Sequence, residues 1–120
     1  MKPKVSSTQF GTIIINDQCY DYDIYIDASG KINKRMKKLS KKIHGTTHIL
    51  SLPEAELIYE EGVEKIIIGS GYEGILTLSD DAKRFFEMHN CKVEINPTPV
   101  AVDNWNKEIK KSVGLFQITC

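Results

Sequence analysis

A set of glycines at fixed spacing follows a short apolar run in the middle of this 120-residue chain. The stretch IIIGSGYEG places Gly69, Gly71 and Gly74 at the G-x-G-x-x-G spacing of a dinucleotide-binding turn. In that motif a helix opens within the glycines, and its N-terminus receives the pyrophosphate. Here residues 75–78 intervene before the next capping residue, Ser79. The spacing therefore indicates a tight turn whose amides could meet a small anion, and we expect no nucleotide cofactor.

The basic run between residues 31 and 42 holds seven cations and no acid. If Ala-Ser-Gly at 28–30 forms a hairpin turn, a stripe of aspartates lies opposite the cations. That register pairs Asp27 with Lys31, Asp23 with Arg35, Asp21 with Lys37, Ile26 with Ile32 and Tyr22 with Met36. Such opposite-charge pairs stabilise a sheet, and the run has no aromatic residue on which bases could stack. A solvated, self-neutralised face is therefore favoured over nucleic-acid binding, with Lys38, Lys41 and Lys42 free to meet an anion.

The histidines His44 and His48 have the i, i+4 spacing of side chains that share a helix face. Residues 45–47, Gly-Thr-Thr, are poor helix formers, so both histidines are expected in a loop or strand. A zinc site would need a further ligand, and nothing in the spacing ties Cys19 or Asp23 to this segment. We therefore expect no metal site and a hydrogen-bonded structural role for His48.

Catalytic residues are not assigned by the sequence. No nucleophile elbow, no Ser/His/Asp order and no pair of carboxylates with a defined separation is visible. Cys91 opens a predicted strand, where a buried and inert thiol is usual. Cys120 would need cations brought in by the fold to become a thiolate. These observations favour a protein without catalytic activity.

The composition of the chain argues against two classes of binding partner, nucleic acids and membranes. Sixteen cations balance sixteen anions, so no global charge directs the chain to nucleic acid or to an anionic membrane. No apolar run approaches the ~20 residues of a membrane-spanning helix. The opening MKPKVSSTQF resembles neither a signal peptide nor a transit peptide, and three dispersed cysteines fit reduced thiols. We expect a cytoplasmic protein that binds neither nucleic acid nor membrane.

The elements that position these residues fall into two halves. In the first half, strands are predicted at Phe10–Ile15, Tyr20–Asp27 and Lys31–Lys38, with turns at 16–17 and 28–30. In the second half, Ser51–Glu54 is a capping box that opens a helix ending near Gly62. Further helices begin at Ser79 and at Thr98-Pro99, and short apolar strands are predicted at 63–68, 92–95 and 113–119. The predicted inward faces are Ala82, Phe85, Phe86 and His89 in one helix, and Ala101, Val102, Trp105 and Ile109 in the other.

Helices that alternate with short strands imply parallel pairing through right-handed crossovers. We therefore predict one compact α/β domain over residues 1–120, in which an antiparallel β unit packs with a βαβαβ-like half.

Several stretches together resemble one known family: DIYIDASGKINKRMKKLSKKIHGTTHILSLPEAE, IIIGSGYEG, PTPVAVDNWN and the closing TC. They are similar to a small α/β domain family of unknown function that was first catalogued from a methanogen protein. Its members include an adipogenesis-associated cytosolic protein and mitochondrial complex I assembly factor 3. The resemblance implies three β/β/α layers and no established catalytic activity. The family pattern falls on Arg35, Lys37, Ser40, Lys41, Gly45, His48, Gly69, Gly71, Gly74, Thr98 and Pro99.

Two functions of different classes fit these residues. The first is a non-catalytic module that binds a protein partner or assists an assembly, without a cofactor and with its oligomeric state open. The second is a small-molecule or anion site, enzymatic or not, in a crevice beside the glycines, since ligands favour the carboxyl ends of parallel strands. The candidate ligand-binding residues are Arg35, Lys41, His48, Gly69, Ser70, Gly71 and Gly74.

Overall fold

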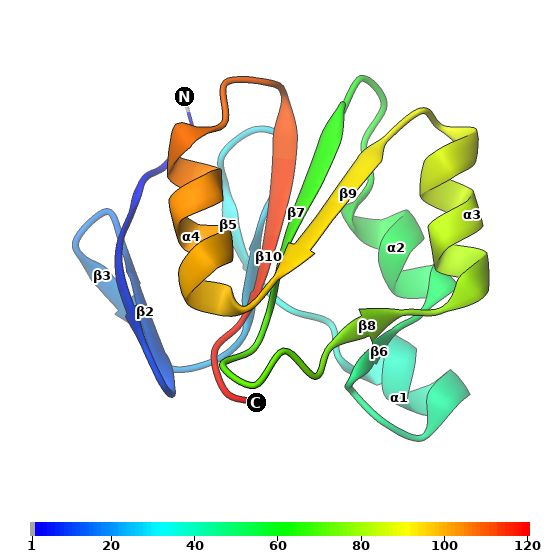
Figure 1. Ribbon diagram of the computed structural model, residues 1–120, viewed down its shortest axis with the longest axis horizontal. Helices are drawn as coiled ribbons and strands as arrows, with labels where there is room; N and C mark the ends of the chain where they lie inside the picture. The colour runs from blue at the N-terminus through cyan, green and yellow to red at the C-terminus, as the bar shows by residue number, and fades with distance from the viewer. Residues whose placement is uncertain (1) are drawn as a thin grey trace.

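The computed structural model describes residues 2–120 and arranges them in three layers. A central sheet runs in the order β5 (Ile32–Lys34), β4 (Ile24–Ile26), β10 (Ser112–Gln117), β7 (Lys65–Ser70), β9 (Lys92–Asn96). Helices α2 (Leu52–Ile58) and α3 (Asp80–Met88) cover one face (Figure 1). On the other face, α4 (Thr98–Lys107) lies beside a sheet of β1 (Val5–Gln9), β2 (Thr12–Ile15) and β3 (Gln18–Tyr20). The predicted compact α/β fold with β/β/α layers is confirmed.

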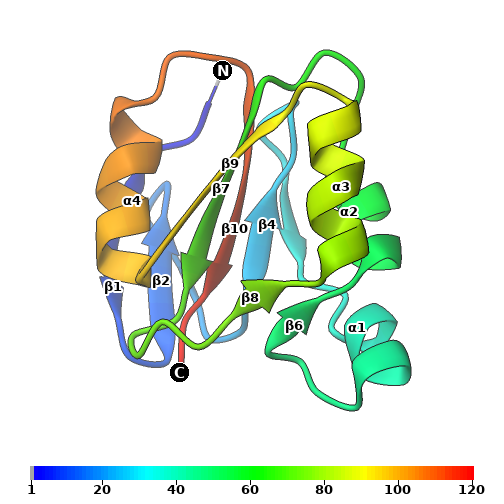
Figure 2. The same ribbon diagram turned by 45° about the vertical axis from the view of Figure 1, so that its right-hand side comes forward.

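Parallel pairing in the second half follows from its alternating helices and strands. β7 pairs in parallel with β10 on one side and with β9 on the other. The chain reaches β9 through β8 (Thr77–Leu78) and α3, then returns through α4 on the opposite face to β10 (Figure 2). The first crossover moves along the sheet in one direction on one face, and the second moves in the opposite direction on the other face. Both crossovers therefore have the same hand, as the rule for parallel strands requires. The predicted βαβαβ-like half is confirmed.

Two apolar clusters hold the layers against the central sheet. Ile66 and Ile68 pack toward Phe86 on the side of α2 and α3, whereas Ile67 packs toward Trp105 on the side of α4. This alternation is the period-two pattern of a strand that is buried on both faces. Each of these fully buried isoleucines contributes about 1.5–3 kcal/mol to stability. The carboxyl end of β7 is therefore held rigidly between two packed layers.

The hairpin of β4 and β5 forms with the register that the sequence predicts. Ile26 pairs with Ile32, and Ile24 pairs with Lys34. Gly30 adopts the left-handed conformation with φ of 89°, and its N–H donates to the carbonyl of Asp27. The predicted turn at residues 28–30 is confirmed.

The Asp27 carboxylate takes other partners than the expected ion pair with Lys31. It accepts hydrogen bonds from the main-chain N–H groups of Ser29 and Lys31 and from Nδ2 of Asn33. Burial raises the pKa of this carboxyl, but the bonds from Ser29, Asn33 and the main chain outweigh burial and lower it. The prediction of a cross-strand ion pair at this position was wrong because the turn itself supplies the donors.

The expected strand Tyr20–Asp27 is interrupted between the two sheets. Residues 18–20 form β3, residues 24–26 form β4, and residues 21–23 carry the chain from one sheet to the other. Oδ1 of Asp23 accepts a hydrogen bond of 2.8 Å from the N–H of Ile118 and fixes the crossing point. Tyr22, which lies in this connection, is 39% exposed. The interruption could not be predicted from the local alternation of residue types, because the hydrogen-bond partner of Asp23 lies 95 residues away in the sequence.

The N-terminal hairpin begins earlier than the sequence indicates. β1 was not predicted, and it pairs antiparallel with β2. The turn at Phe10 and Gly11 shortens the expected strand Phe10–Ile15 to Thr12–Ile15. Asn16 and Asp17 have positive φ angles of 50° and 64°, which suits a two-residue turn between twisted strands.

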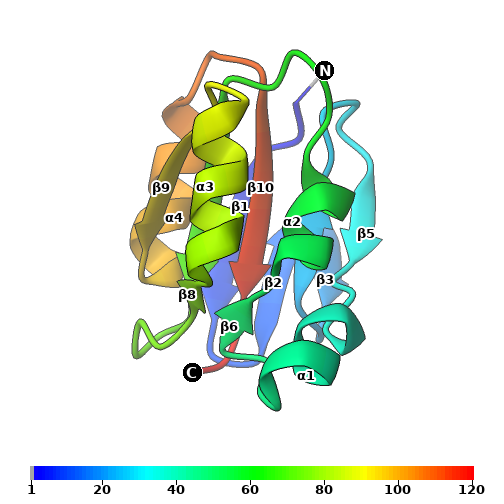
Figure 3. The same cartoon turned by 90° about the vertical axis from the view of Figure 1, so that its right-hand side faces the viewer.

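The basic run is a strand only in its first part. β5 ends at Lys34, and residues Lys38–His44 form the helix α1, which packs against α2 (Figure 3). Gly45 ends this helix in the left-handed conformation with φ of 71°. The predicted strand Lys31–Lys38 was therefore too long, and His44 lies in a helix, because the leucine and lysines that follow Met36 are good helix formers.

The predicted N-caps of the next two helices are confirmed. Oγ of Ser51 accepts a hydrogen bond from the N–H of Glu54, and Oγ of Ser79 accepts one from the N–H of Ala82. Acidic residues occupy the first turn of both helices, where the helix dipole favours negative charge.

The helix ends differ more from expectation. α2 ends at Ile58 rather than near Gly62. His89 and Ile109, expected on inward faces, are exposed because each follows the last residue of its helix. Over residues 2–120, every helix is too short or too polar to cross a bilayer.

An ion triad lies at the amino end of β7. Nζ of Lys65 lies 2.8 Å from Oε2 of Glu94 in β9 and also contacts the carboxylate of Glu108, which follows α4. The hydrogen bonds to Glu108 and Glu94 raise the pKa of Lys65. The bond from Lys65 and the N–H of Lys110 lower the pKa of Glu108 to about 2.

We predict that Glu108→Gln removes part of the acid sensitivity of the fold. The pKa of Glu108 is lowered on folding, so the ion pair contributes stability above the ordinary pKa of 4.5 and loses it as the pH falls toward 2. The variant should lose on the order of 1 kcal/mol at neutral pH and decline less steeply below pH 4.5 in urea unfolding. Asp103→Asn, an exposed site on α4, is the control. Parallel curves for wild type and Glu108→Gln would contradict the prediction.

Candidate functional site

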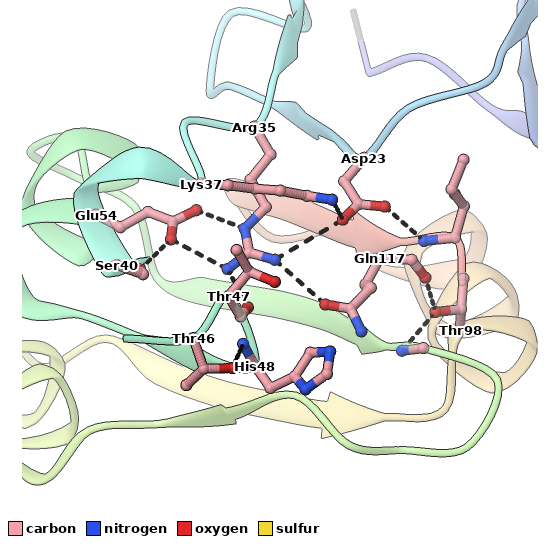
Figure 4. Close-up of polar contacts among 12 residues, drawn as sticks. Asp23, Arg35, Lys37, Ser40, Thr46, Thr47, His48, Glu54, Thr98 and Gln117 are labelled. Atoms are coloured by element: carbon pink, nitrogen blue, oxygen red, sulfur yellow. Dashed lines mark hydrogen bonds and ion pairs between the residues drawn. The ribbon is translucent and has the colours of Figure 1, made fainter. Parts of the chain in front are cut away.

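Arg35 lies at the centre of a buried polar cluster (Figure 4). The chain turns inward directly after β5, and the side chain is 0% exposed. Nε donates to Oε2 of Glu54 at 2.7 Å, and Nη2 donates to Oε1 of the same carboxylate at 3.2 Å. Nη2 also donates to the carbonyl of Thr47, and Nη1 donates to Oε1 of Gln117. Because a guanidinium stays charged in a folded protein, it requires this ring of acceptors.

Glu54 is the anion of the central pair and connects two helices. In a capping box the Glu side chain bonds back to the N–H of the cap residue. Here the carboxylate accepts from Arg35 and from Oγ of Ser40 in α1, and the N–H of Ser51 donates to Oγ of Ser40 instead. The capping box is therefore opened, and its acid joins α1 and α2 to the end of β5.

Asp23 supplies the second carboxylate. Its Oδ2 lies 2.9 Å from Nζ of Lys37 and 3.8 Å from Nη1 of Arg35, and it forms a hydrogen bond with neither. This oxygen is stabilised only by the positive charges of Lys37 and Arg35. The cluster therefore contains two cations, Arg35 and Lys37, and two anions, Glu54 and Asp23. The expected partner of Lys37 was Asp21, and Asp23 takes its place because the chain changes sheets at this point.

Gln117 links the cluster to the glycines. Its Oε1 accepts from Arg35, whereas its buried Nε2 has no acceptor in the part of the chain that the structure describes. The carbonyl of Gln117 accepts from Oγ1 of Thr98, and the same Oγ1 accepts from the N–H of Gly71. A buried donor without a partner costs about 1–3 kcal/mol, and Nε2 is the buried side-chain donor of residues 2–120 that lacks one.

The glycine loop, residues 69–74, is closed by its own contacts. Gly69 and Ser70 are buried in β7 rather than in the expected turn. The N–H groups of residues 72 and 73 donate to the main-chain oxygens of residues 119 and 120, and the N–H of Gly74 donates to the carbonyl of Gly71. The expectation of open amides was wrong, because the last residues of the described chain occupy them.

Close packing explains the glycine spacing. A Cβ on Gly69 would lie 2.8 Å from Oγ1 of Thr98, and a Cβ on Gly71 would lie 1.9 Å from the main-chain carbon of Cys120. Gly71 and Gly74 also have φ of 96° and 69°, a region that other residues rarely adopt. The loop leads into β8, so it lacks the helix that would receive a pyrophosphate.

The two remaining predicted ligand residues lie in different surroundings. His48 is half-buried, and its main-chain N–H donates to Oγ1 of Thr46 at 3.1 Å. In Figure 4 its imidazole lies on the side of Gln117 toward which Nε2 points. Lys41 is exposed on α1, and no contact within the described cluster involves it. The structure thus gathers Arg35, His48 and the glycine loop around Gln117 and leaves Lys41 outside.

A groove of about 530 Å³ lies on the solvent side of the cluster. Its apolar walls are Tyr22 and Met36, which are 39% and 47% exposed. Nζ of Lys34 lies 5.2 Å from the centroid of the Tyr22 ring. The other lining residues are Asp23, Arg35, Lys37 and Lys38. We call this feature the Tyr22–Met36 groove; the hairpin register predicted that these two side chains face each other.

Within residues 2–120, no three side chains of His, Cys, Asp or Glu gather as metal ligands. Burial raises the pKa of the Cys91 thiol to about 11, which suits the inert thiol that the sequence predicts.

Sequence reasoning missed Glu54 and Gln117 as members of the cluster. Gln117 is a polar residue near the end of the otherwise apolar run VGLFQI, and this break in the pattern was an available signal. Glu54 carried no separate signal, because the capping box already accounted for it.

We predict that the central pair is structural. Arg35→Met and Glu54→Leu should each lower the free energy of unfolding by about 3–5 kcal/mol, because each leaves a buried charge uncompensated. The double variant should be more stable than either single variant, whereas Lys41→Ala, on the exposed face of α1, should change stability by less than about 0.5 kcal/mol. Urea unfolding measures all four. Single variants that cost below about 1 kcal/mol would refute this role.

Comparison with solved structures agrees with this fold. A structure of the conserved hypothetical protein PH1505 from Pyrococcus horikoshii is 33% identical, with a TM-score of 0.91 over 98% of this chain and 99% of that one. The Methanobacterium protein MT938 is 27% identical, with a TM-score of 0.84 over 99% and 100%. A Bordetella pertussis protein described as a Mth938-like domain shares the fold at 15% identity and a TM-score of 0.64, over 97% and 85%.

Among curated proteins, no sequence matches this chain. The model of a protein family of unknown function, DUF498/DUF598, matches residues 5–114. That match covers most of the chain and confirms the family resemblance seen in the sequence. The chain therefore belongs to the DUF498/DUF598 family.

Proposed function

We propose that this protein is a protein-interaction module, of the kind that assists an assembly, and that its partner binds the Tyr22–Met36 groove. The observation that carries the proposal is the pair of exposed side chains Tyr22 and Met36 within one concavity. Aromatic side chains and methionine are enriched at the centre of protein interfaces, and polar side chains form the rim. The groove has this composition, with lysines around its apolar walls.

The floor of the groove supports the same proposal. Arg35 and Asp23 are fixed by the buried cluster, so the walls stand on a part of the fold that is already ordered. Binding to a preformed surface loses less conformational entropy than binding to a mobile one. A partner would therefore find the groove in its binding conformation.

A small-anion site at Gln117 is a second candidate function, and the unpartnered Nε2 favours it. The four donors of Arg35 that face Glu54, Thr47 and Gln117 are already used, and the glycine amides are used as well. The groups that remain to bind an anion are Nε2 and the nearby His48. The two carboxylates of the cluster oppose a highly charged ligand. A small monoanion such as formate fits these limits best.

We predict that Met36→Glu weakens partner binding through the groove. A carboxylate in place of the thioether removes the apolar wall and should weaken binding by at least about tenfold, or about 1.4 kcal/mol. The measurement is affinity capture from the native cell with quantitative mass spectrometry. Met88→Glu is the matched control, because Met88 is 81% exposed on α3, away from the groove. Partners captured equally by wild type and by Met36→Glu would exclude the groove as their site.

If an anion binds at Gln117, it should raise the melting temperature of the protein. Millimolar formate that binds the native state should raise the melting temperature of the wild type by several degrees, and phosphate and sulfate, which carry more charge, should raise it less. Gln117→Glu should remove the shift, because its carboxylate still accepts from Arg35 but repels an anion where Nε2 stood. Lys41→Ala should keep the shift. If none of the three anions raises the melting temperature at millimolar concentration, the site does not exist.

A further inference from the structure

The outer edge of the central sheet is open where it borders the groove. β5 is the last strand in the order of the sheet, and among residues 2–120 no strand pairs with its outer side (Figure 3). The N–H of Asp27 donates to the carbonyl of Lys31, and the N–H of Arg35 donates to the carbonyl of Asp23. Bonded pairs alternate along an antiparallel ladder, so Asn33 is bonded inward to Tyr25.

The alternation directs the main-chain groups of Ile32 and Lys34 away from β4. These two residues therefore present N–H and C=O groups in the pattern that an added strand requires. The groove continues from this edge, because Met36 lies two residues after the end of β5 and Nζ of Lys34 lies over the ring of Tyr22. A strand laid along β5 would direct alternate side chains toward Tyr22 and Met36.

The charges around the β5 edge determine which kind of strand can bind there. One acid, Asp23, lines the groove, and it pairs with Lys37, whereas Arg35 pairs with Glu54. The remaining cations of the lining, Lys34 and Lys38, leave the groove with a net positive charge. A second copy paired through β5 would bring like charges of two lysine-rich edges together, which is how natural edge strands avoid self-association. An acidic segment gains from the same charges.

We propose that the partner is recognised through an extended acidic segment, with alternating apolar residues, that adds a strand to β5 and fills the Tyr22–Met36 groove. This inference rests on the proposed function and specifies its ligand. Main-chain hydrogen bonds to Ile32 and Lys34 supply affinity, and the apolar groove with its lysine rim supplies selectivity.

The test is a display library of random peptides of about 12 residues, long enough for one strand, selected on the purified protein. Peptides whose binding is lost in Met36→Glu should be rich in Asp and Glu, alternating with apolar residues. Their affinity should fall by about tenfold or more when NaCl is raised from about 50 to about 500 mM, because salt screens exposed charges.

Hydrogen exchange on the peptide complex reads out the added strand. The N–H groups of Ile32 and Lys34 should exchange at least about tenfold more slowly in the complex, whereas the N–H of Asn33, already bonded to β4, should change little. Lys38→Glu should weaken binding. Lys42→Glu makes the same charge change one turn later on α1, outside the groove, and should not.

The possible results distinguish the proposal of an acidic added strand from the proposal of an interaction module. Peptides that depend on Met36 but are neutral or basic, or that leave the N–H groups of Ile32 and Lys34 unprotected, would overturn the acidic strand and leave the interaction module standing. Protection of the same groups in the free protein at high concentration would show that a second copy is the occupant. If no selected peptide depends on Met36, the groove is not a binding site and the proposed function fails with the inference.

Discussion

The buried charge of Arg35 is the constraint on which the arrangement of the other elements depends. A guanidinium keeps its proton in the interior, and leaving it uncompensated would cost several kcal/mol. Its partners come from separate parts of the chain: Glu54 in α2, Thr47 before β6 (Ile49–Leu50), Gln117 at the end of β10 and Asp23 before β4. All of these parts must meet at one point before the side chain can be enclosed. The cluster therefore ties the hairpin to the closure of the central sheet.

The same inward turn produces the exposed groove. Neighbouring side chains of an extended segment point to opposite sides, so burying Arg35 leaves Lys34 and Met36 outside. Asp23 is held from within by the N–H of Ile118, and the crossing that it fixes brings Tyr22 to the surface opposite Met36. The apolar walls and the lysine rim thus follow from a structural requirement.

Much of the fold could be predicted because its signals are local. The hairpin register followed from alternation on both sides of Gly30, and the caps at Ser51 and Ser79 bond to N–H groups three residues away. The break after Tyr20 could not be predicted, because its cause is a bond from Asp23 to a residue 95 positions later. At the site, the sequence indicated Arg35, His48 and the glycines but neither Glu54 nor Gln117. Glu54 fitted a local role in the capping box, and only the folded chain shows that Arg35 takes its carboxylate.

The glycine loop and the β5 edge show how main-chain donors decide where recognition can occur. The loop has the spacing of a phosphate-binding motif, but Gly69 and Gly71 are required by contacts with Thr98 and Cys120. The amides of residues 71–74 already donate to Oγ1 of Thr98 or to main-chain oxygens. The glycine spacing is therefore a product of packing. At β5 the sequence shows no motif, yet the phase of the ladder leaves the N–H groups of Ile32 and Lys34 facing outward. Because an incoming peptide can bond only to donors that the fold has left free, the edge is the better recognition surface of the two.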